Sequence, residues 1–247
     1  MPPLKMANMV GRLFQSLKLI DLLRRQGPKW LIFRVGYAIQ RKLGFQRRKF
    51  SPFRWDEKPL STWLKPEVPA NPTDYLAYRR QSGGRFFFQG DEQVCYRPIL
   101  EKLVGEEQEV LFAEIDKLAG GTFTFFSKSE FQVGIPPDWH THVLTARRLS
   151  PWRHWTEIHD LDPDQDIKFV WELSRFSFVF PLVRAYWLTG DERYPQIFWR
   201  LIENWLEQNP PQLGPNWMCG QEATFRLMAW IFGLYGFNAS TQSTPER

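Results

Sequence analysis

The sequence predicts a mainly α-helical fold made of helical hairpins, with an irregular N-terminal segment and one or two short strands. Long segments with apolar residues at helical spacing fill the second half of the 247-residue chain. The first two of these segments begin beside acidic residues and end at glycine or proline, as helices do. Aromatic residues make up 16% of the chain, which provides enough apolar area to exclude a disordered protein.

Residues 1–54 form a basic leader in which two amphipathic helices are expected, over 10–26 and 28–44. The leader holds 13 Lys and Arg residues against a single acid, Asp21, whereas the rest of the chain carries a net charge of −7. The simplest interpretation is a helical hairpin docked on the body with its basic face in solvent. Contact with an anionic membrane or an acidic polysaccharide is the alternative. Nucleic acid is not an expected partner, because no binding motif accompanies the charge.

Residues 55–105 are rich in proline and glycine and are expected to form an irregular linking segment. A helix is predicted over 106–119, because glutamates mark its start and a Gly-Gly pair its end. The alternation of GTFTFF over 121–126 predicts a short strand.

Three longer helices are expected in the remainder of the body, which spans 106–237. Their predicted ranges are 166–189, 192–208 and 219–235. Each is rich in Trp, Phe and Leu on more than one side, which indicates burial between neighbouring helices. Two antiparallel helices followed by the start of another hairpin favour a helical bundle or an α/α toroid. The polar residues 238–247 are expected to be frayed.

Several classes of site are not indicated by the sequence. Two cysteines, Cys95 and Cys219, exclude a disulfide-rich scaffold and a four-cysteine zinc site. The four histidines lack a metal-ligand spacing, and no phosphate-binding loop or nucleophile elbow is present, so neither a metal nor a cofactor is expected. No stretch reaches the ~18 apolar residues of a membrane span, and no signal-peptide core is visible, which favours the cytoplasm.

Charged residues inside the aromatic helices are the first candidates for a functional site. Lys168, Glu172 and Arg175 fall at i, i+4 and i+7, and Glu222 and Arg226 at i, i+4. Such pairs commonly do no more than stabilise an exposed helix. Here they lie among large apolar side chains, where a charge needs a partner or a polar cleft.

Aromatic residues in the predicted loops are the second candidates. Trp139 and His140, Trp155, and the pair Asn216 and Trp217 lie in three such loops. The last two loops precede helices that are separated by one antiparallel helix, so both are expected at the same end of the body. Aromatic faces stack on sugar rings and polar side chains bind hydroxyls, which suits a saccharide. The alternative is that these tryptophans only anchor long loops.

The same stretches resemble the N-terminal helical domain of the heparinase II/III family of polysaccharide lyases. The resemblance covers residues 121–232 and is carried by FTFF at 123–126, PPDWH at 136–140, HWTEIHDLD at 154–162, DIKFVWELSRF at 166–176, AYWLTGDERY at 185–194, WLEQNPPQLGPNW at 205–217 and QEATFRLMAW at 221–230. It implies an incomplete α/α toroid that a β-sandwich would follow, and a periplasmic location. It also implies cleavage of uronate-containing polysaccharide by β-elimination, with acidic, glycosaminoglycan-like polymer as the partner.

The family's catalytic Asn, His and Tyr residues lie beyond the part of the pattern that this sequence matches. We therefore expect an N-terminal fragment that is inactive alone and exposes apolar faces that favour self-association. The residues expected to bind substrate are Trp139, His140, Trp155, Trp171, Glu172, Arg175, Asn216, Trp217, Glu222 and Arg226. Arg175 or Arg226 would meet a uronate carboxylate. The alternatives are a non-catalytic glycan-binding or membrane-surface protein, or a glycoside hydrolase that uses two of Glu157, Glu172 and Glu222.

Overall fold

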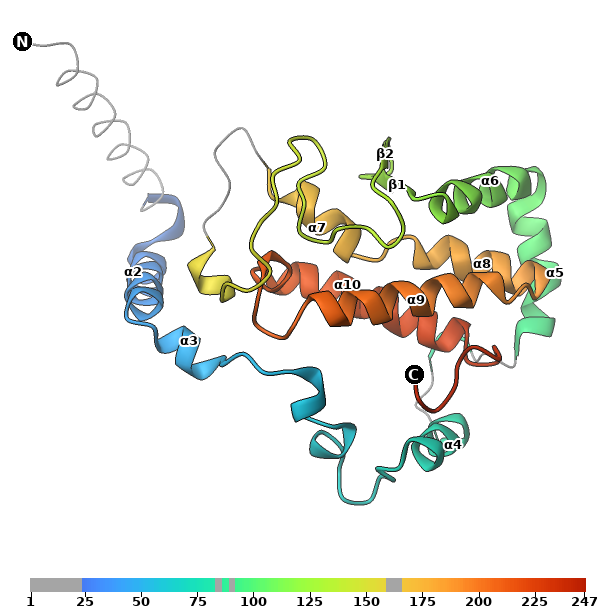
Figure 1. Cartoon of the computed structure of the whole chain (residues 1–247), viewed down its shortest axis with the longest axis horizontal. Coiled ribbons are helices and arrows are strands. Elements are labelled where there is room, and N and C mark those ends of the chain that lie inside the picture. The colour runs from blue at the N-terminus through green and yellow to red at the C-terminus, as the bar shows by residue number, and fades with distance from the viewer. Residues whose placement is uncertain (1–23, 83–85, 89–91, 159–165) are drawn as a thin grey trace, which may run out of the picture. The chain divides into compact units, whose positions relative to one another are not determined.

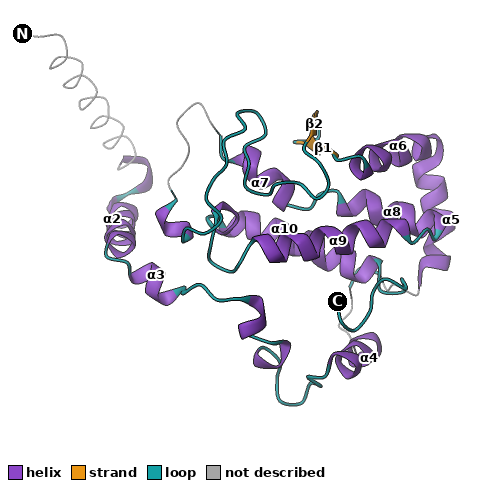
Figure 2. Cartoon of the chain, viewed as in Figure 1, coloured by secondary structure: helices purple, strands orange, loops and turns teal. Residues whose placement is uncertain are grey.

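A computed structural model describes residues 24–82, 86–88, 92–158 and 166–247 (Figure 1). Helices dominate these residues, and their strands form a single two-stranded sheet (Figure 2), which confirms the mainly α prediction. The chain divides into two units, one that ends at Ser51 and one that spans Pro52–Arg247. The helix predicted over 10–26 falls mostly outside the described residues. No helix in the described part of the chain combines the length and apolar character needed to cross a bilayer.

The first unit contains the helices α2 (Pro28–Lys42) and α3 (Phe45–Lys49). Proline suits the first position of α2, where a backbone N–H has no helical partner. Gly44 then adopts a left-handed conformation, with φ of 75°, and ends the helix, so the predicted helix over 28–44 is slightly shorter. Neither helix contains a buried residue.

Two further helices occupy the segment that was expected to be irregular. They are α4 (Pro72–Ser82) and α5 (Gln93–Val104), and they correct the expectation for 55–105. The prolines in this segment suggested irregular structure, but two of them are compatible with helices for different reasons. Pro72 stands at the first position of α4, where it costs no hydrogen bond. Pro98 lies inside α5, and this helix packs against a neighbouring helix, which offsets the unfavourable residue.

The predicted helix and strand near residue 120 are both present. Helix α6 (Gln108–Ala119) buries one apolar face, formed by Leu111, Ile115 and Leu118. Strand β1 (Thr122–Phe125) follows, and β2 (Ser129–Gln132), which was not predicted, pairs with it antiparallel. Gly121, with φ of 87°, joins α6 to β1, and a Cβ there would lie 2.7 Å from the Cα of Gly134.

The helix predicted over 166–189 is broken into two, which corrects that prediction. Helix α7 (Lys168–Ser174) ends before a short break, and α8 (Val179–Thr189) starts anew. Phe176 lies in the break with φ of 59°, and its buried ring stacks on Trp139 with 5.3 Å between ring centroids. Stacking of these buried rings stabilises a backbone conformation that the local sequence does not favour.

Helices α8, α9 (Arg193–Gln208) and α10 (Gly220–Gly236) form the centre of the second unit (Figure 1). The predicted ranges of the last two helices agree with the structure to within one residue. Two glycines bring α10 close to its neighbours. A Cβ on Gly233 would lie 2.4 Å from Cε2 of Phe198, and one on Gly236 would lie 2.6 Å from Cγ1 of Val183. Closure of these helices into a toroid stays a prediction.

The polar C-terminal segment packs against the body, which corrects the expectation of a frayed tail. Ser240 is buried, and its Oγ donates to Oε2 of Glu192 at 2.5 Å. The Ser243 hydroxyl accepts from Nε1 of Trp199 at 3.2 Å. These side-chain hydrogen bonds order the segment although it offers little apolar area to bury.

Candidate functional site

An ionic network joins the end of α7 to the start of α10. Arg175 donates from Nε and Nη2 to the two carboxylate oxygens of Glu222, at 2.6 and 2.8 Å. It also donates from Nη1 to Glu172. The guanidinium thus bridges two carboxylates from different helices, in the bidentate geometry that makes such pairs strong. The pair of Glu172 and Arg175 that the sequence indicated is present. Glu222, however, forms its ion pair with Arg175 rather than with Arg226.

The side chains of this network are largely shielded from solvent. Both glutamates are buried, and the side chain of Arg175 retains 20% of its exposure. Its hydrogen bonds to Glu222 raise the pKa of Arg175, so the guanidinium keeps its charge at every physiological pH. A buried carboxylate that lost this partner would carry an uncompensated charge.

The network also contacts the turn between β1 and β2. The backbone N–H of Phe126 donates to Oε1 of Glu172 at 3.0 Å. Phe126 and Ser127 both have left-handed backbone conformations, with φ of 53° and 56°, in a turn that contains no glycine. Left-handed conformations of such residues cost free energy and persist where surrounding contacts hold them. Glu172 supplies one of those contacts.

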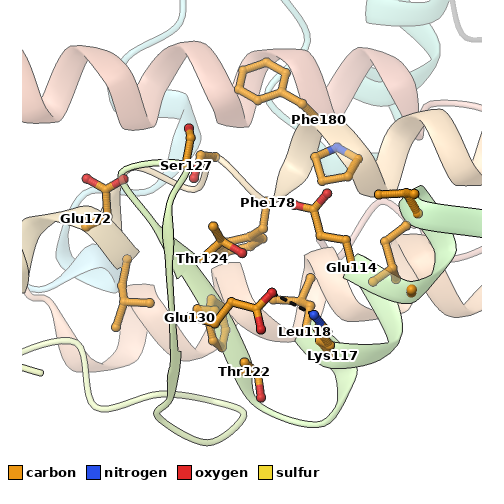
Figure 3. A pocket seen from close by; sticks show the side chains of 17 residues that line it. Glu114, Lys117, Leu118, Thr122, Thr124, Ser127, Glu130, Glu172, Phe178 and Phe180 are labelled. Atoms are coloured by element: carbon orange, nitrogen blue, oxygen red, sulfur yellow. Dashed lines mark hydrogen bonds and ion pairs between the residues drawn. The ribbon is translucent and has the colours of Figure 1, made fainter. Parts of the chain in front are cut away.

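A cavity of about 710 Å³ lies between α6, the β1–β2 hairpin and the break between α7 and α8 (Figure 3). We call it the hairpin cavity. Its lining combines hydroxyl, carboxylate, ammonium and aromatic groups, contributed among others by Thr122, Thr124, Ser127, Ser177, Glu114, Glu130, Glu172, Lys117, Phe178 and Phe180. In Figure 3 the carboxylates of Glu172, from α7, and Glu114, from α6, lie toward opposite sides of the cavity. Glu172 therefore belongs to both the network and the cavity wall.

The charge of the hairpin cavity is negative. Three glutamates line it against one lysine, and Lys117 Nζ contacts Glu130 Oε1 at 2.8 Å. The volume is that of a small-molecule pocket, and the combination of hydroxyls with phenyl rings suits a ligand that has hydroxyl groups and an apolar face. In the described part of the chain, no group of three or more His, Cys, Asp or Glu residues is placed to hold a metal ion.

Arg226 occupies a second, fully enclosed cluster. Its guanidinium carbon lies 4.2 Å from the ring centroid of Trp205, and Trp217 and Trp230 are also in cation–π range. Nη1 and Nη2 donate to the backbone carbonyls of Ser174 and Asn216, at 3.4 and 3.2 Å. Burial lowers the pKa of Arg226 to about 10, which still leaves it charged at neutral pH. Its contacts connect α10 to the end of α7 and the loop before α10.

Three of the predicted loop residues lie in the core. Trp139 is fully buried, and its Nε1 donates to Asn204 Oδ1 at 2.9 Å. Asn216 is buried and donates to the carbonyl of Trp139 at 3.0 Å. His140 is also buried, and burial lowers its pKa to about 4, so the imidazole is neutral at physiological pH. Such buried positions agree with the alternative interpretation, in which these residues anchor long loops to the body.

The other predicted tryptophans are half-buried. Nε1 of Trp155 donates to Gln212 Oε1, and Nε1 of Trp171 donates to the carbonyl of Pro215, each at 2.9 Å. The Trp217 ring packs beside Trp55, with 6.1 Å between centroids. Each tryptophan thus joins segments distant in sequence, and none of the three lines the hairpin cavity.

Of the ten predicted residues, Glu172 lines the hairpin cavity, and Arg175 and Glu222 are connected to it through the ionic network. The residues of α6 and the hairpin were missed. A signal for two of them was present, because Thr122 and Thr124 alternate with buried phenylalanines and so face away from the core. Glu157, considered for hydrolysis, is exposed and does not line the cavity. His159 lies outside the described residues.

Comparison with known proteins identifies the same region of the chain. Residues 122–231 match the family described as Heparinase II/III N-terminus. Over 79 residues the chain is 37% identical to a heparin-sulfate lyase of Bacteroides thetaiotaomicron. This alignment covers 30% of the chain and 11% of the length of that lyase. No solved structure matches the chain. The family match runs from β1 into α10 and contains the whole ionic network, whereas α6 precedes it.

Proposed function

We propose that the chain binds a glycosaminoglycan-type polysaccharide as part of a polysaccharide lyase, because residues 122–231 match the family described as Heparinase II/III N-terminus. The observation that carries the proposal is the hairpin cavity, which lies largely within the family region and shares Glu172 with the ionic network. The cavity is large enough to take a sugar unit, and its lining offers hydrogen-bonding groups beside phenyl rings.

The charges of the cavity determine which part of such a polymer it takes. Three carboxylates and one ammonium group would repel a uronate or a sulfate. They would accept hydrogen bonds from hydroxyl groups and attract an amino sugar. We assign to the cavity a sugar unit without negative charge, and place the anionic groups of the polymer outside it.

Arg175 acts in this proposal as a positioning residue. Its donors already engage two carboxylates, so it does not offer a free guanidinium to a uronate. It holds Glu172, and Glu172 in turn holds the turn that carries Ser127, a lining residue. Arg226 is enclosed by tryptophans and likewise has its contacts within the fold.

The proposal assigns binding, and not bond cleavage, to the described part of the chain. β-Elimination needs a base and an acid beside one sugar. The hairpin cavity has neither a histidine nor a tyrosine in its lining. Hydrolysis by Glu172 and Glu222 is not favoured, because Arg175 binds both carboxylates and neither is free to donate a proton to a glycosidic oxygen.

Binding is tested by filling the cavity. Thr124→Trp places a large side chain in the lining, whereas Ser129→Trp puts the same side chain on β2, where residue 129 pairs with Phe125 and does not line the cavity. We expect affinity for heparan-sulfate oligosaccharides, measured by isothermal titration calorimetry, to fall at least about tenfold for Thr124→Trp, a loss of about 1.4 kcal/mol. Ser129→Trp should leave it unchanged. Equal affinities of the two variants would reject the cavity as the binding site.

Turnover is tested separately from binding. The wild-type chain is incubated with heparan sulfate, and formation of the unsaturated uronate product is followed by ultraviolet absorbance. We expect binding without product. Turnover would show that this chain carries catalytic groups of its own and would leave the binding assignment intact.

A further inference from the structure

An exposed aliphatic stripe runs along α2 and includes the residue that caps its C-terminus. Its residues recur at the spacing i, i+3, i+7 and i+11, which places them on one side of a helix. They are Ile32, Val35, Ile39 and Leu43, and they are 72%, 49%, 52% and 60% exposed. Large aliphatic side chains that align on one face and remain this exposed mark an interaction surface.

The two helices of the first unit, α2 and α3, are strongly basic. The sequence contains no Asp or Glu between Asp21 and Asp56. Basic residues fill the last turns of both helices, namely Arg41, Lys42, Arg47, Arg48 and Lys49. A partner for this surface therefore needs both a negatively charged face and an apolar layer that can take the stripe.

We propose that α2 and α3 dock on an anionic lipid membrane. The aliphatic stripe enters the boundary between headgroups and acyl chains, and the basic residues contact lipid phosphates. A hydrated polysaccharide or a nucleic acid would satisfy the charge but would leave the stripe in water. Of these three partners, the membrane is the one that accepts both features. This inference concerns the first unit and does not depend on glycan binding by the second.

Two neighbouring substitutions separate the apolar contribution from the electrostatic one. Ile39→Glu and Gln40→Glu add the same negative charge to α2, but only the first removes an aliphatic residue from the stripe. Gln40 Oε1 accepts from Nε2 of Gln46 at 3.1 Å, and glutamate keeps an acceptor oxygen at that position. Both variants are therefore compatible with the helix, which circular dichroism of the full chain checks.

The assay is co-sedimentation of the full chain with phosphatidylcholine vesicles that contain phosphatidylglycerol. We expect Gln40→Glu to weaken binding by no more than about fivefold, because it changes one surface charge. Ile39→Glu should weaken it about fiftyfold or more, because burial of an isoleucine is also lost. Ile32→Gln provides a second, uncharged test of the stripe and should weaken binding about tenfold.

Two results would overturn the inference. The first is an equal effect of Ile39→Glu and Gln40→Glu, which would reduce the surface to its charge alone. The second is tight binding of the wild type to heparin beads or duplex DNA, unaffected by Ile32→Gln, with none to vesicles. Vesicles of phosphatidylcholine alone should bind the wild type far more weakly, since they lack the negative charge.

Discussion

Replacing Arg175 with glutamine tests the central role of the ionic network. The substitution leaves Glu172 and Glu222 buried without the guanidinium that bridges them. Removal of one partner from a fully buried ion pair costs about 3–5 kcal/mol. Arg175 is 20% exposed, so solvent reduces this figure, and we expect a loss of about 2–4 kcal/mol in the free energy of unfolding at neutral pH. Equilibrium urea denaturation followed by tryptophan fluorescence measures it.

A matched control separates loss of the buried network from loss of an ordinary surface ion pair. Arg193→Gln is the matched control, because Arg193 also pairs with a carboxylate, Asp191, but is 70% exposed. The control should not change the denaturation midpoint. If Arg175→Gln shifts the midpoint no further than the control does, the network does not hold α7 and α10 together.

Two more predictions use the same denaturation assay. Gly233→Ala should lower stability by about 1–3 kcal/mol, because its Cβ would lie 2.4 Å from the Phe198 ring, and Gly220→Ala, which meets no atom within 4 Å, should not. An unchanged Gly233→Ala would contradict the close packing of α10. Burial lowers the pKa of His140 from 6.5 to about 4, so the unfolded state binds more protons between these values and stability falls as the pH drops through them. His140→Gln should remove about 3 kcal/mol from the loss of stability that occurs over this pH range. An unaltered profile of stability against pH would show that His140 is not the residue responsible.

The sequence predicts the fold class well because the long helices have strong apolar periodicity and clear ends. It fails where contacts between distant residues decide the local conformation. The break between α7 and α8 is the best example, since Phe176 takes its left-handed conformation against Trp139, a residue that lies far away in sequence. One local signal was overlooked. Pro181 falls in the first turn of α8, where its missing N–H is tolerated, and it would have interrupted a continuous helix.

The candidate site was predicted only in part, for a related reason. The charged pairs drew attention to Glu172, Arg175 and Glu222, and the structure brings these three together. The sequence of the β1–β2 hairpin contains little that would predict its turn. Its turn has neither the glycine nor the asparagine that usually marks two left-handed residues, and Glu172 supports it from a distant helix. A sequence pattern records local preference, so a turn held by a buried carboxylate is not visible in it.

The location of α6 limits what the family match can say about the ligand. The matched range, 122–231, begins at β1, yet α6 supplies one wall of the hairpin cavity, including Glu114 and Lys117. Lys117 also forms an ion pair with Glu130 of β2, and this pair connects α6 to the hairpin. The network inside the matched range fixes the turn, while residues outside it set much of the charge that a sugar would meet. Under our proposal, the preference for an uncharged sugar unit is therefore a property of this chain and its α6, and does not follow from the family region alone.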